Sequence, residues 1–473
     1  MTSNSFLYFI VRAGNGVFAI AALAVFTRLL SPADYGVYAL GMATASVLSA
    51  ILFQWLNEAV VRFYPLYIHD PNKVVAVAIR GFLAGTAATT LIFLGILPFK
   101  NVFGMELVQV VILFLITIAL GFYSLVLQMA IAECAPVRFG LLSWAKNGGS
   151  LLAGFVLISY GFTQHGALMG FLMGLVFAVT AFASKPWITM KLGNVDASLS
   201  TEMFRYGLPL TLNSLAILVV DVADRFMIGN LLGASHVAPY AVAYVLVQQS
   251  VGTIMNVLFM ATFPLIVKVF EGKRDEPTRI HLQALGKRLV GIGLPVAVGI
   301  GVIASDIAEI MFGSGYRQGA GEIMPWLAAA IFVGAFKNYF FDLVFQLRNA
   351  TQYQGLIAIL MAAVNILMNA LLLPHFGVIA AAWATLAAFL VGALASWHLG
   401  KAMFLLPPIG VTFWHSALAS ITMGCVIYSL PATSEITLLL VKIFFGLSIY
   451  AAIAWSLDIA NFRSILKAWL VSQ

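Results

Sequence analysis

Long apolar stretches recur along almost the whole chain, separated by short segments that contain most of the charged residues and many of the prolines. An apolar helix needs about 20 residues to cross the roughly 30 Å hydrocarbon core of a membrane. Measured against that length, the pattern predicts fourteen membrane-spanning helices, at residues 6–30, 37–62, 74–97, 106–130, 138–160, 166–190, 206–232, 237–267, 284–311, 323–346, 353–373, 377–399, 409–430 and 436–458. The breaks at Pro32, Pro71 and Pro407 fall between these spans, where a missing backbone N–H costs least.

The composition places the chain among membrane proteins. Of its 473 residues, 62% are hydrophobic and only 9% are charged, whereas soluble globular domains contain about 25% charged residues. So few charges cannot cover the surface of a soluble particle of this size, which excludes a soluble enzyme. We expect an all-α polytopic membrane protein whose outer surface contacts the lipid bilayer.

Basic residues are distributed unevenly between alternate loops. With the N-terminus in the cytoplasm, 16 of the 25 Lys and Arg residues fall in cytoplasmic segments, and only Arg28, Lys100 and Arg317 fall in external loops. Because cytoplasmic loops are enriched in Lys and Arg, we expect a multi-pass protein of the inner (cytoplasmic) membrane with both termini cytoplasmic. The net charge of +7 then reflects topology and contact with anionic headgroups, and predicts no nucleic-acid partner.

Two short sequence patterns occur once in each half of the chain. Residues 28–39 and 230–241 share Leu, Leu, Tyr and Ala at corresponding places, and residues 125–128 are similar to 343–346. Six predicted spans separate the copies, so the two halves should run parallel to each other, as in many transporters built from repeats. We predict a six-helix lobe at 1–195, a second at 196–402, and two additional helices with a cytoplasmic tail at 403–473.

Three motifs resemble those of one membrane-protein family. They are Arg28-Leu29-Leu30-Ser31-Pro32 with Tyr35-Gly36-x-Tyr38, Tyr206-Gly207-Leu208-Pro209, and Asp224-Arg225-Phe226-Met227-Ile228 with Leu232-Gly233. In these the sequence resembles the polysaccharide-biosynthesis flippases, the O-antigen and exopolysaccharide repeat-unit translocases of the multidrug/oligosaccharidyl-lipid/polysaccharide exporter superfamily. The sequence departs from the family at Ala238, because the family's second repeat usually has a glycine there, as the first repeat has Gly36. How tight the turn of the second repeat is therefore stays open.

The resemblance implies a positively charged cavity for a polyprenyl-diphosphate-linked oligosaccharide, used in lipopolysaccharide or exopolysaccharide assembly. We interpret the chain as a flippase that works by alternating access, with polysaccharide polymerase machinery as a candidate protein partner. No cofactor is expected, and Na⁺ or H⁺ is the candidate coupling ion.

Three basic residues lie inside predicted spans of the first lobe. Arg12, Arg80 and Lys146 are about six to eight residues from the cytoplasmic ends of their spans, a depth of about 9–12 Å by helical rise. A charge at the centre of a span costs at least about 2.5–3.5 kcal/mol on insertion scales. Snorkelling would explain any one of them, but together they predict a cationic cavity that binds the diphosphate, because Arg and Lys both bind phosphate oxygens.

Lys337 is the corresponding candidate in the second lobe, near the middle of span 323–346. Asp342 lies five residues further on, about 140° around a regular helix, so we expect no good ion pair between the two. Lys337 is therefore predicted to contact phosphate. Asp306 and Glu309, near the outer end of span 284–311, are expected to be interfacial.

Acidic residues inside spans are candidates for ion coupling. Asp221 and Arg225 are four residues apart on one helical face, with Asp224 beside them, and Glu58 stands in the same relation to Arg62. Each set is either a neutralised pair that holds helices together or a site where a carboxylate exchanges H⁺ or Na⁺, and both interpretations are kept.

Sugar rings need polar groups at their edges and flat surfaces at their faces. The candidate polar contacts are Asn213, Gln248, Gln249 and Asn256, with Ser250, Asn365 and Asn369 as further amide or hydroxyl groups. The candidate stacking residues are Tyr38, Trp55, Tyr240, Tyr244 and Trp326. Aromatic residues in membrane proteins more often pack or anchor at the membrane interface.

Two other transporters fit the same pattern, a cation-coupled multidrug exporter and a peptidoglycan lipid-precursor flippase. The exporter would favour an acidic, aromatic cavity.

A membrane glycosyltransferase or polymerase is less favoured, because the external loops are short and no GxSxG, HExxH or nucleotide-binding glycine motif is present. No Cys/His spacing predicts a metal site. We expect a transporter and not an enzyme.

Overall fold

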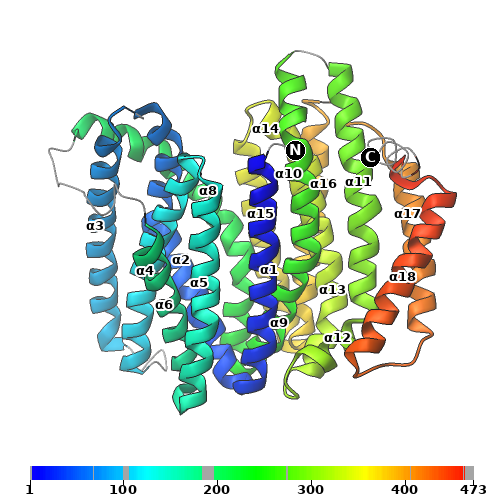
Figure 1. Cartoon of the computed structure of the whole chain (residues 1–473), viewed down its shortest axis with the longest axis horizontal. Coiled ribbons are helices and arrows are strands. Elements are labelled where there is room, and N and C mark those ends of the chain that lie inside the picture. The colour runs from blue at the N-terminus through cyan, green and yellow to red at the C-terminus, as the bar shows by residue number, and fades with distance from the viewer. Residues whose placement is uncertain are drawn as a thin grey trace. The chain divides into compact units, whose positions relative to one another are not determined.

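The computed structural model of the chain describes residues 3–67, 69–99, 106–183, 196–272, 275–404, 406–461 and 463. This part of the chain is built of helices and contains no β-strand (Figure 1). The helices are α1 (Ser3–Leu29), α2 (Pro32–Phe63), α3 (Pro71–Ile96), α4 (Leu107–Ala132), α5 (Pro136–Leu157), α6 (Thr163–Phe182), α8 (Ala197–Leu231), α9 (Ala234–Val247), α10 (Thr253–Glu271), α11 (Asp275–Val302), α12 (Ala304–Met311), α13 (Arg317–Phe336), α14 (Leu343–Leu347), α15 (Gln352–Phe376), α16 (Ile379–Gly400), α17 (Gly410–Tyr428) and α18 (Ile436–Ser456).

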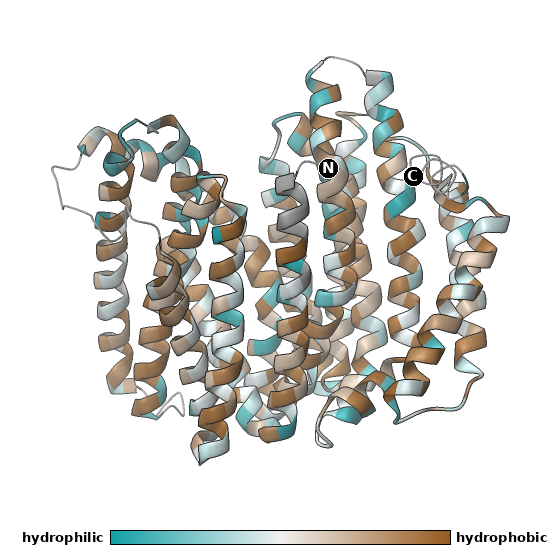
Figure 2. Ribbon diagram, in the orientation of Figure 1, coloured by the Kyte–Doolittle hydropathy of each residue, from teal (hydrophilic) through white to brown (hydrophobic). Residues whose placement is uncertain are grey.

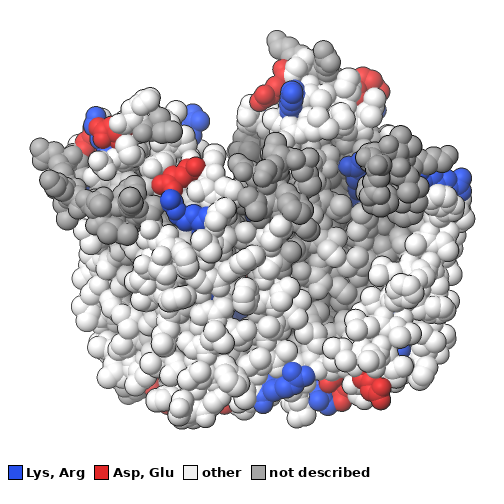
Figure 3. All heavy atoms as spheres, viewed as in Figure 1, with Lys and Arg blue, Asp and Glu red and all other residues white. Residues whose placement is uncertain are grey.

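Thirteen helical segments of the described chain are long and apolar enough to cross a membrane. One of them, Pro136–Phe182, contains both α5 and α6, which pack against each other as a hairpin. With these two counted separately, the predictions of fourteen spans and an all-α polytopic fold are confirmed. The helices are mainly apolar along their length (Figure 2), and on the face seen in Figure 3 most of the visible Lys, Arg, Asp and Glu side chains lie toward the top and the bottom of the view.

The chain divides into two compact units, Met1–Gly229 and Asn230–Gln473, called unit 1 and unit 2 below. The second lobe was expected to begin at residue 196, whereas α8 lies in unit 1 as far as Gly229. Unit 1 therefore contains α1 to α6 and nearly all of α8.

Glycines bring α5 and α6 of unit 1 close together. A Cβ atom on Gly170 would overlap the backbone of Gly154, and one on Gly174 would overlap Ser150 and the carbonyl group of Lys146. Small residues at four-residue intervals allow close packing of membrane helices. The glycines of α6 thus hold it against the turn of α5 that contains Lys146.

The motif around Ser31 begins α2. The hydroxyl oxygen of Ser31 accepts a hydrogen bond from the backbone N–H of Asp34 (3.2 Å), and Pro32 occupies the first turn. Both are favoured at helix N-termini. In the second repeat, the turn is made by Gly233 (φ 98°), and Ala238 is buried inside α9. The alanine at this position therefore does not affect the turn.

The Tyr-Gly-Leu-Pro motif lies where α8 approaches α2. A Cβ atom on Gly207 would overlap the carbonyl group of Trp55. On either side of this contact, Phe204 packs against Trp55 and Tyr206 packs against Phe63, with ring centroids 5.1 and 5.7 Å apart. Because the two backbones approach so closely, a residue with a side chain would not fit at position 207.

In unit 2, α13 packs against α16, α11 and α9, and α17 packs against α11 and α18. Lys442 of α18 forms a buried ion pair with Asp306 of α12, and the backbone N–H of Thr433 donates a hydrogen bond to the same carboxylate (2.9 Å). Asp306 is 4% exposed, because these two partners satisfy its charge inside the protein. Its position at the membrane interface stays a prediction.

Candidate functional site

Lys146 of α5 lies between two aromatic rings. Its Nζ is 5.6 Å from the ring centroid of Tyr123 on α4 and 5.6 Å from that of Phe171 on α6, a range in which an ammonium group is attracted to the ring face. Within the described part of the chain, no carboxylate lies within ion-pairing distance of Lys146. Its charge is therefore able to attract an anion from outside the protein.

Polar contacts fix α1 beside this lysine. The side-chain amide of Asn147 on α5 donates a hydrogen bond to Asn15 Oδ1 on α1 (2.9 Å). Arg12 is one turn from Asn15, and its side chain is exposed. The structure thus places Arg12 and Lys146 on two helices that pack against each other.

Arg80 is located differently. Its helix, α3, has α2 and α4 as its principal neighbours, whereas α1 packs mainly against α5. The side chain of Arg80 is exposed. Helix packing therefore places Arg12 and Lys146 on neighbouring helices, and Arg80 on a helix with other principal neighbours.

Lys337 and Asp342 form a buried ion pair in unit 2. Lys337 Nζ is 2.7 Å from Asp342 Oδ2, and the side chains are 5% and 6% exposed. The expectation that their spacing would keep them apart is wrong. Residues Lys337–Phe341 form a π-helical turn, in which the backbone N–H of Asp342 donates to the carbonyl oxygen of Lys337 (2.9 Å). A π turn brings residues i and i+5 together.

Asp342 has a second partner on a neighbouring helix. The hydroxyl of Ser396 on α16 donates a hydrogen bond to Asp342 Oδ1 (2.6 Å), and Lys337 also donates to Asn338 Oδ1 (3.3 Å). The charge of Lys337 is therefore neutralised by the protein itself in this structure, in contrast to that of Lys146.

Glu58 belongs to a polar network inside unit 1. The side-chain amide of Gln54 donates to Glu58 (2.8 Å), and that of Asn57 donates to Gln54 (3.1 Å) and to Ser124 of α4 (3.3 Å). In the described chain, Arg62 is not within ion-pairing distance of Glu58, so the neutralised pair, one of the two interpretations kept for these residues, is not formed in this structure. The amides at 54 and 57, which sequence reasoning missed, position the carboxylate instead.

Three charged residues, Asp221, Asp224 and Arg225, lie in the C-terminal half of α8. Asp224 is fully buried, and Asp221 and Arg225 are partly buried. Arg225 is close enough to Tyr38 of α2 to interact with it electrostatically. All three charged residues have interactions with other groups of the protein.

The candidate sugar contacts are dispersed. Asn256 of α10 donates a hydrogen bond to the hydroxyl of Tyr339 (2.9 Å). Gln248 and Gln249 lie in the π-helical turn Gln248–Gly252, where Gln248 is exposed and Gln249 is half-buried. The side chain of Asn213 lies outside the described residues.

All five candidate stacking residues pack against other aromatic rings of the protein. Tyr240 is fully buried, with its hydroxyl 3.2 Å from that of Thr385 and its ring stacked on Tyr244 at a centroid distance of 6.1 Å. Trp326 packs edge-to-face against Trp383 at 5.8 Å, although it is 42% exposed. A sugar could reach Trp326 more easily than Tyr240.

Residues 25–320 match the model of a family described as polysaccharide biosynthesis protein. The chain is similar to a "Putative O-antigen transporter" of Shigella flexneri, with 27% identity over 335 residues, covering 67% of this chain and 78% of that protein. It is also similar to a "Probable low-salt glycan biosynthesis flippase Agl15" of Haloferax volcanii, with 22% identity over 314 residues, covering 63% of each chain.

Solved structures share the fold. The lipid II flippase MurJ in an inward closed conformation has a TM-score of 0.70 at 15% identity, covering 98% of this chain and 100% of that chain. An inward-facing multidrug resistance transporter of the MATE family has a TM-score of 0.67 at 13% identity, covering 84% and 97%. At these identities the likeness concerns the fold alone.

Proposed function

Because this chain belongs to the polysaccharide biosynthesis protein family, we propose that it flips polyprenyl-diphosphate-linked oligosaccharide units across the cytoplasmic membrane. Translocation occurs by alternating access, and the flipped units supply the polymerase machinery that assembles a surface polysaccharide. The transport roles named for the two relatives support a transporter and not an enzyme.

The observation that supports this proposal best is the environment of Lys146. An ammonium group inside a span is costly, and the rings of Tyr123 and Phe171 offset only part of that cost. A diphosphate that approached Lys146 would supply the missing negative charge. Arg12, on the adjacent helix, adds a guanidinium group that can bind phosphate oxygens through two parallel hydrogen bonds.

Replacing Lys146 tests the proposal in cells. A deletion strain that expresses Lys146→Met should make at least about tenfold less surface polysaccharide than the same strain expressing the wild type. The loss of one charged hydrogen bond, about 1.5–3 kcal/mol, corresponds to such a factor. Lys146→Arg keeps the charge between the two rings and should retain most of the activity. Equal polysaccharide from the Met variant and the wild type, at equal membrane abundance, would refute the role of Lys146.

In this proposal Lys337 is a second phosphate contact. Because Asp342 neutralises the charge of Lys337 in this structure, phosphate can bind Lys337 only in a conformation in which this ion pair is broken. Arg80, on α3, is proposed as a further contact for the same headgroup.

We propose ion coupling through the carboxylates of Asp221 and Asp224, with Glu58 as an alternative site in the same unit. Asp224 is buried, so its occupation by H⁺ or Na⁺ would change the local charge strongly. Replacing both aspartates by Asn should abolish the dependence of flipping on the H⁺ or Na⁺ gradient. Unchanged dependence would exclude them, and Glu58→Gln would then be tested in the same way.

A further inference from the structure

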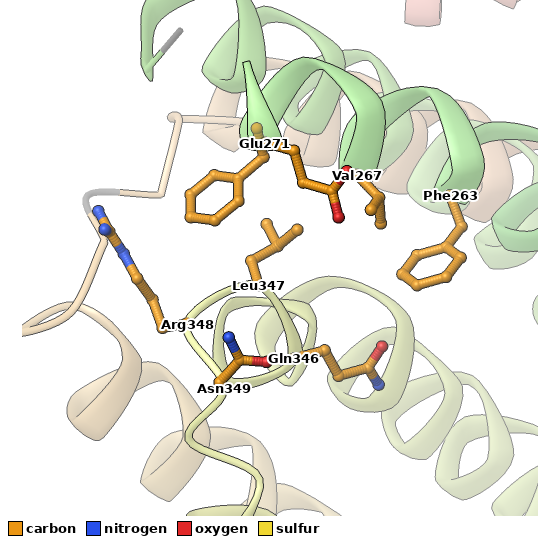
Figure 4. Close-up of a pocket in the computed structure, with 8 residues that line it drawn as sticks. Phe263, Val267, Glu271, Gln346, Leu347, Arg348 and Asn349 are labelled. Carbon is orange, nitrogen blue, oxygen red and sulfur yellow. The ribbon is translucent and has the colours of Figure 1, made fainter. Parts of the chain in front are cut away.

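A pocket of about 680 Å³ lies in unit 2 between the end of α10 and the turn after α14. We call it the α10–α14 pocket. Its lining residues are Phe263, Val267, Phe270, Glu271, Gln346, Leu347, Arg348 and Asn349. Figure 4 shows the residues of α10 on one side and those of α14 and its turn on the other. The volume is within the range of small-molecule sites, about 300–1,000 Å³.

One half of the pocket is polar and offers both donors and acceptors. Glu271 provides a carboxylate, Gln346 and Asn349 provide amides, and Arg348 provides a guanidinium group. In the described chain, none of these side chains forms an ion pair or a hydrogen bond with another protein side chain. Their hydrogen-bonding groups are therefore available to a ligand.

Aromatic rings hold Arg348 in place. Its guanidinium carbon is 5.2 Å from the ring centroid of Phe270 and 5.7 Å from that of Phe404. Both distances are within cation–π range, and such a contact uses none of the N–H groups of the guanidinium. Arg348 is thus a hydrogen-bond donor held beside these two rings at the wall of the pocket.

An aromatic row continues from the pocket along α10. Phe263 of the pocket packs against Phe259 with a centroid distance of 5.0 Å, and Phe259 stacks on Tyr339 at 4.9 Å. Tyr339 accepts the hydrogen bond from Asn256. Asn256, Phe259 and Phe263 follow one another at three- or four-residue intervals on one face of α10, and Tyr339 joins them from the π-helical turn Lys337–Phe341, so the row leads from the helix end into the span.

The mixture of groups favours a sugar over a phosphate. The diphosphate diester of a lipid-linked sugar is fully ionised at neutral pH, so it only accepts hydrogen bonds and would be repelled by Glu271. A sugar hydroxyl both donates and accepts, so it can use the carboxylate, the amides and the guanidinium at once. The C–H face of a pyranose ring can pack on the apolar half, formed by Phe263, Val267 and Leu347.

We propose that the α10–α14 pocket binds a pyranose ring of the substrate oligosaccharide at the membrane surface, and that the aromatic row guides the sugar from there into the span. This inference rests on the proposed flippase function. It assigns the first sugar contact to unit 2, separate from the diphosphate contact at Lys146.

Saturation-transfer NMR on the purified full-length protein in detergent tests the site. The probes are the methyl pyranosides of glucose, galactose, rhamnose and N-acetylglucosamine, together with inorganic pyrophosphate followed by ³¹P line broadening. We expect saturation of the ring protons of at least one pyranoside by the wild type. Glu271→Gln, which weakens the carboxylate acceptor, should reduce the signal about fivefold, and Gln346→Trp, which fills the pocket, should remove it.

Glu276→Gln is the matched control, because Glu276 is an exposed carboxylate of α11 outside the pocket. It should leave the pyranoside signal unchanged. Broadening of pyrophosphate that Gln346→Trp abolishes, without a pyranoside signal, would overturn the inference in favour of an anion site. No signal from any probe, or a pyranoside signal unaffected by both pocket variants, would also overturn it.

A flipping assay separates this inference from the proposed function. In Glu271→Gln, the half-saturating concentration of polyprenyl-diphosphate oligosaccharide should rise while the maximal rate stays near that of the wild type. If the wild type binds pyranosides in the pocket and flips no lipid-linked sugar, the flippase function and the loading role are refuted and the sugar site stands. If flipping proceeds and the pocket variants leave the half-saturating concentration unchanged, the loading role alone is refuted.

Discussion

A lysine inside a membrane span needs an acidic partner, because an uncompensated charge at the helix centre costs about 2.5–3.5 kcal/mol. Lys337 and Lys442 have such partners within unit 2, in Asp342 and Asp306. Lys146 has two aromatic rings near its Nζ and no ion-pair partner among the described residues. This difference is why we assign the diphosphate to Lys146 first.

Replacing Lys337 by Met should lower the free energy of unfolding by about 3–5 kcal/mol, because Asp342 would remain buried without its charged partner. The double variant with Asp342→Asn should recover most of that loss, since neither charge would then be buried. Thermal unfolding of the purified protein measures both. Lys401→Met, at an exposed lysine just after α16, is the control, and a Lys337→Met protein as stable as this control would contradict the buried pair.

The sequence could identify the buried charges but not their partners. Lys337 and Asp342 would be apart on a regular helix, and no hydropathy pattern reveals the extra residue of a π turn. Asp306 and Lys442 are 136 residues apart, so a local pattern cannot connect them. The rings of Tyr123 and Phe171 around Lys146 also come from other helices.

The helices themselves follow directly from the apolar pattern. In a bilayer every backbone N–H and C=O must be satisfied within the protein, so an apolar run of sufficient length has to be a helix. The order in which helices pack could not be predicted, because residues that face lipid and residues that face another helix are both apolar. The close contact of α5 and α6 depends instead on small residues, among them Gly166, Gly170 and Gly174.

We expect Gly174→Val to destabilise the protein by about 1–3 kcal/mol, because the added atoms would overlap Ser150 and the carbonyl group of Lys146. The unfolding temperature in detergent measures this effect. Gly95→Val in α3 makes the same substitution where a Cβ atom would meet nothing within 4 Å, and it should change the unfolding temperature little. Equal effects of the two variants would show that the α5–α6 contact is looser than described.

For the whole molecule, the distribution of Lys and Arg predicts a topology that the fold alone does not test. Both termini and the turn between α4 and α5 should be cytoplasmic. Cys134 lies in that turn and is exposed, whereas Cys425 lies within the α17 span. A native cysteine can therefore report the orientation.

In a Cys425→Ala protein, a membrane-impermeant maleimide should label Cys134 in inverted membrane vesicles and leave it unlabelled in right-side-out cells. The variant that lacks both cysteines gives the background. Labelling from the outside of intact cells would reverse the assigned topology, and with it the side from which Lys146 and the α10–α14 pocket would receive substrate.

The most direct test of the central claim is the movement of substrate by the purified protein in lipid vesicles. A polyprenyl-diphosphate oligosaccharide is placed in both leaflets, and an impermeant periodate reagent oxidises the sugars of the outer leaflet. We predict that the wild type exposes the inner-leaflet sugars to oxidation, that Lys146→Met slows this strongly, and that a cationic dye such as ethidium is not transported. Protection of the inner-leaflet sugars, together with transport of ethidium, would contradict the account.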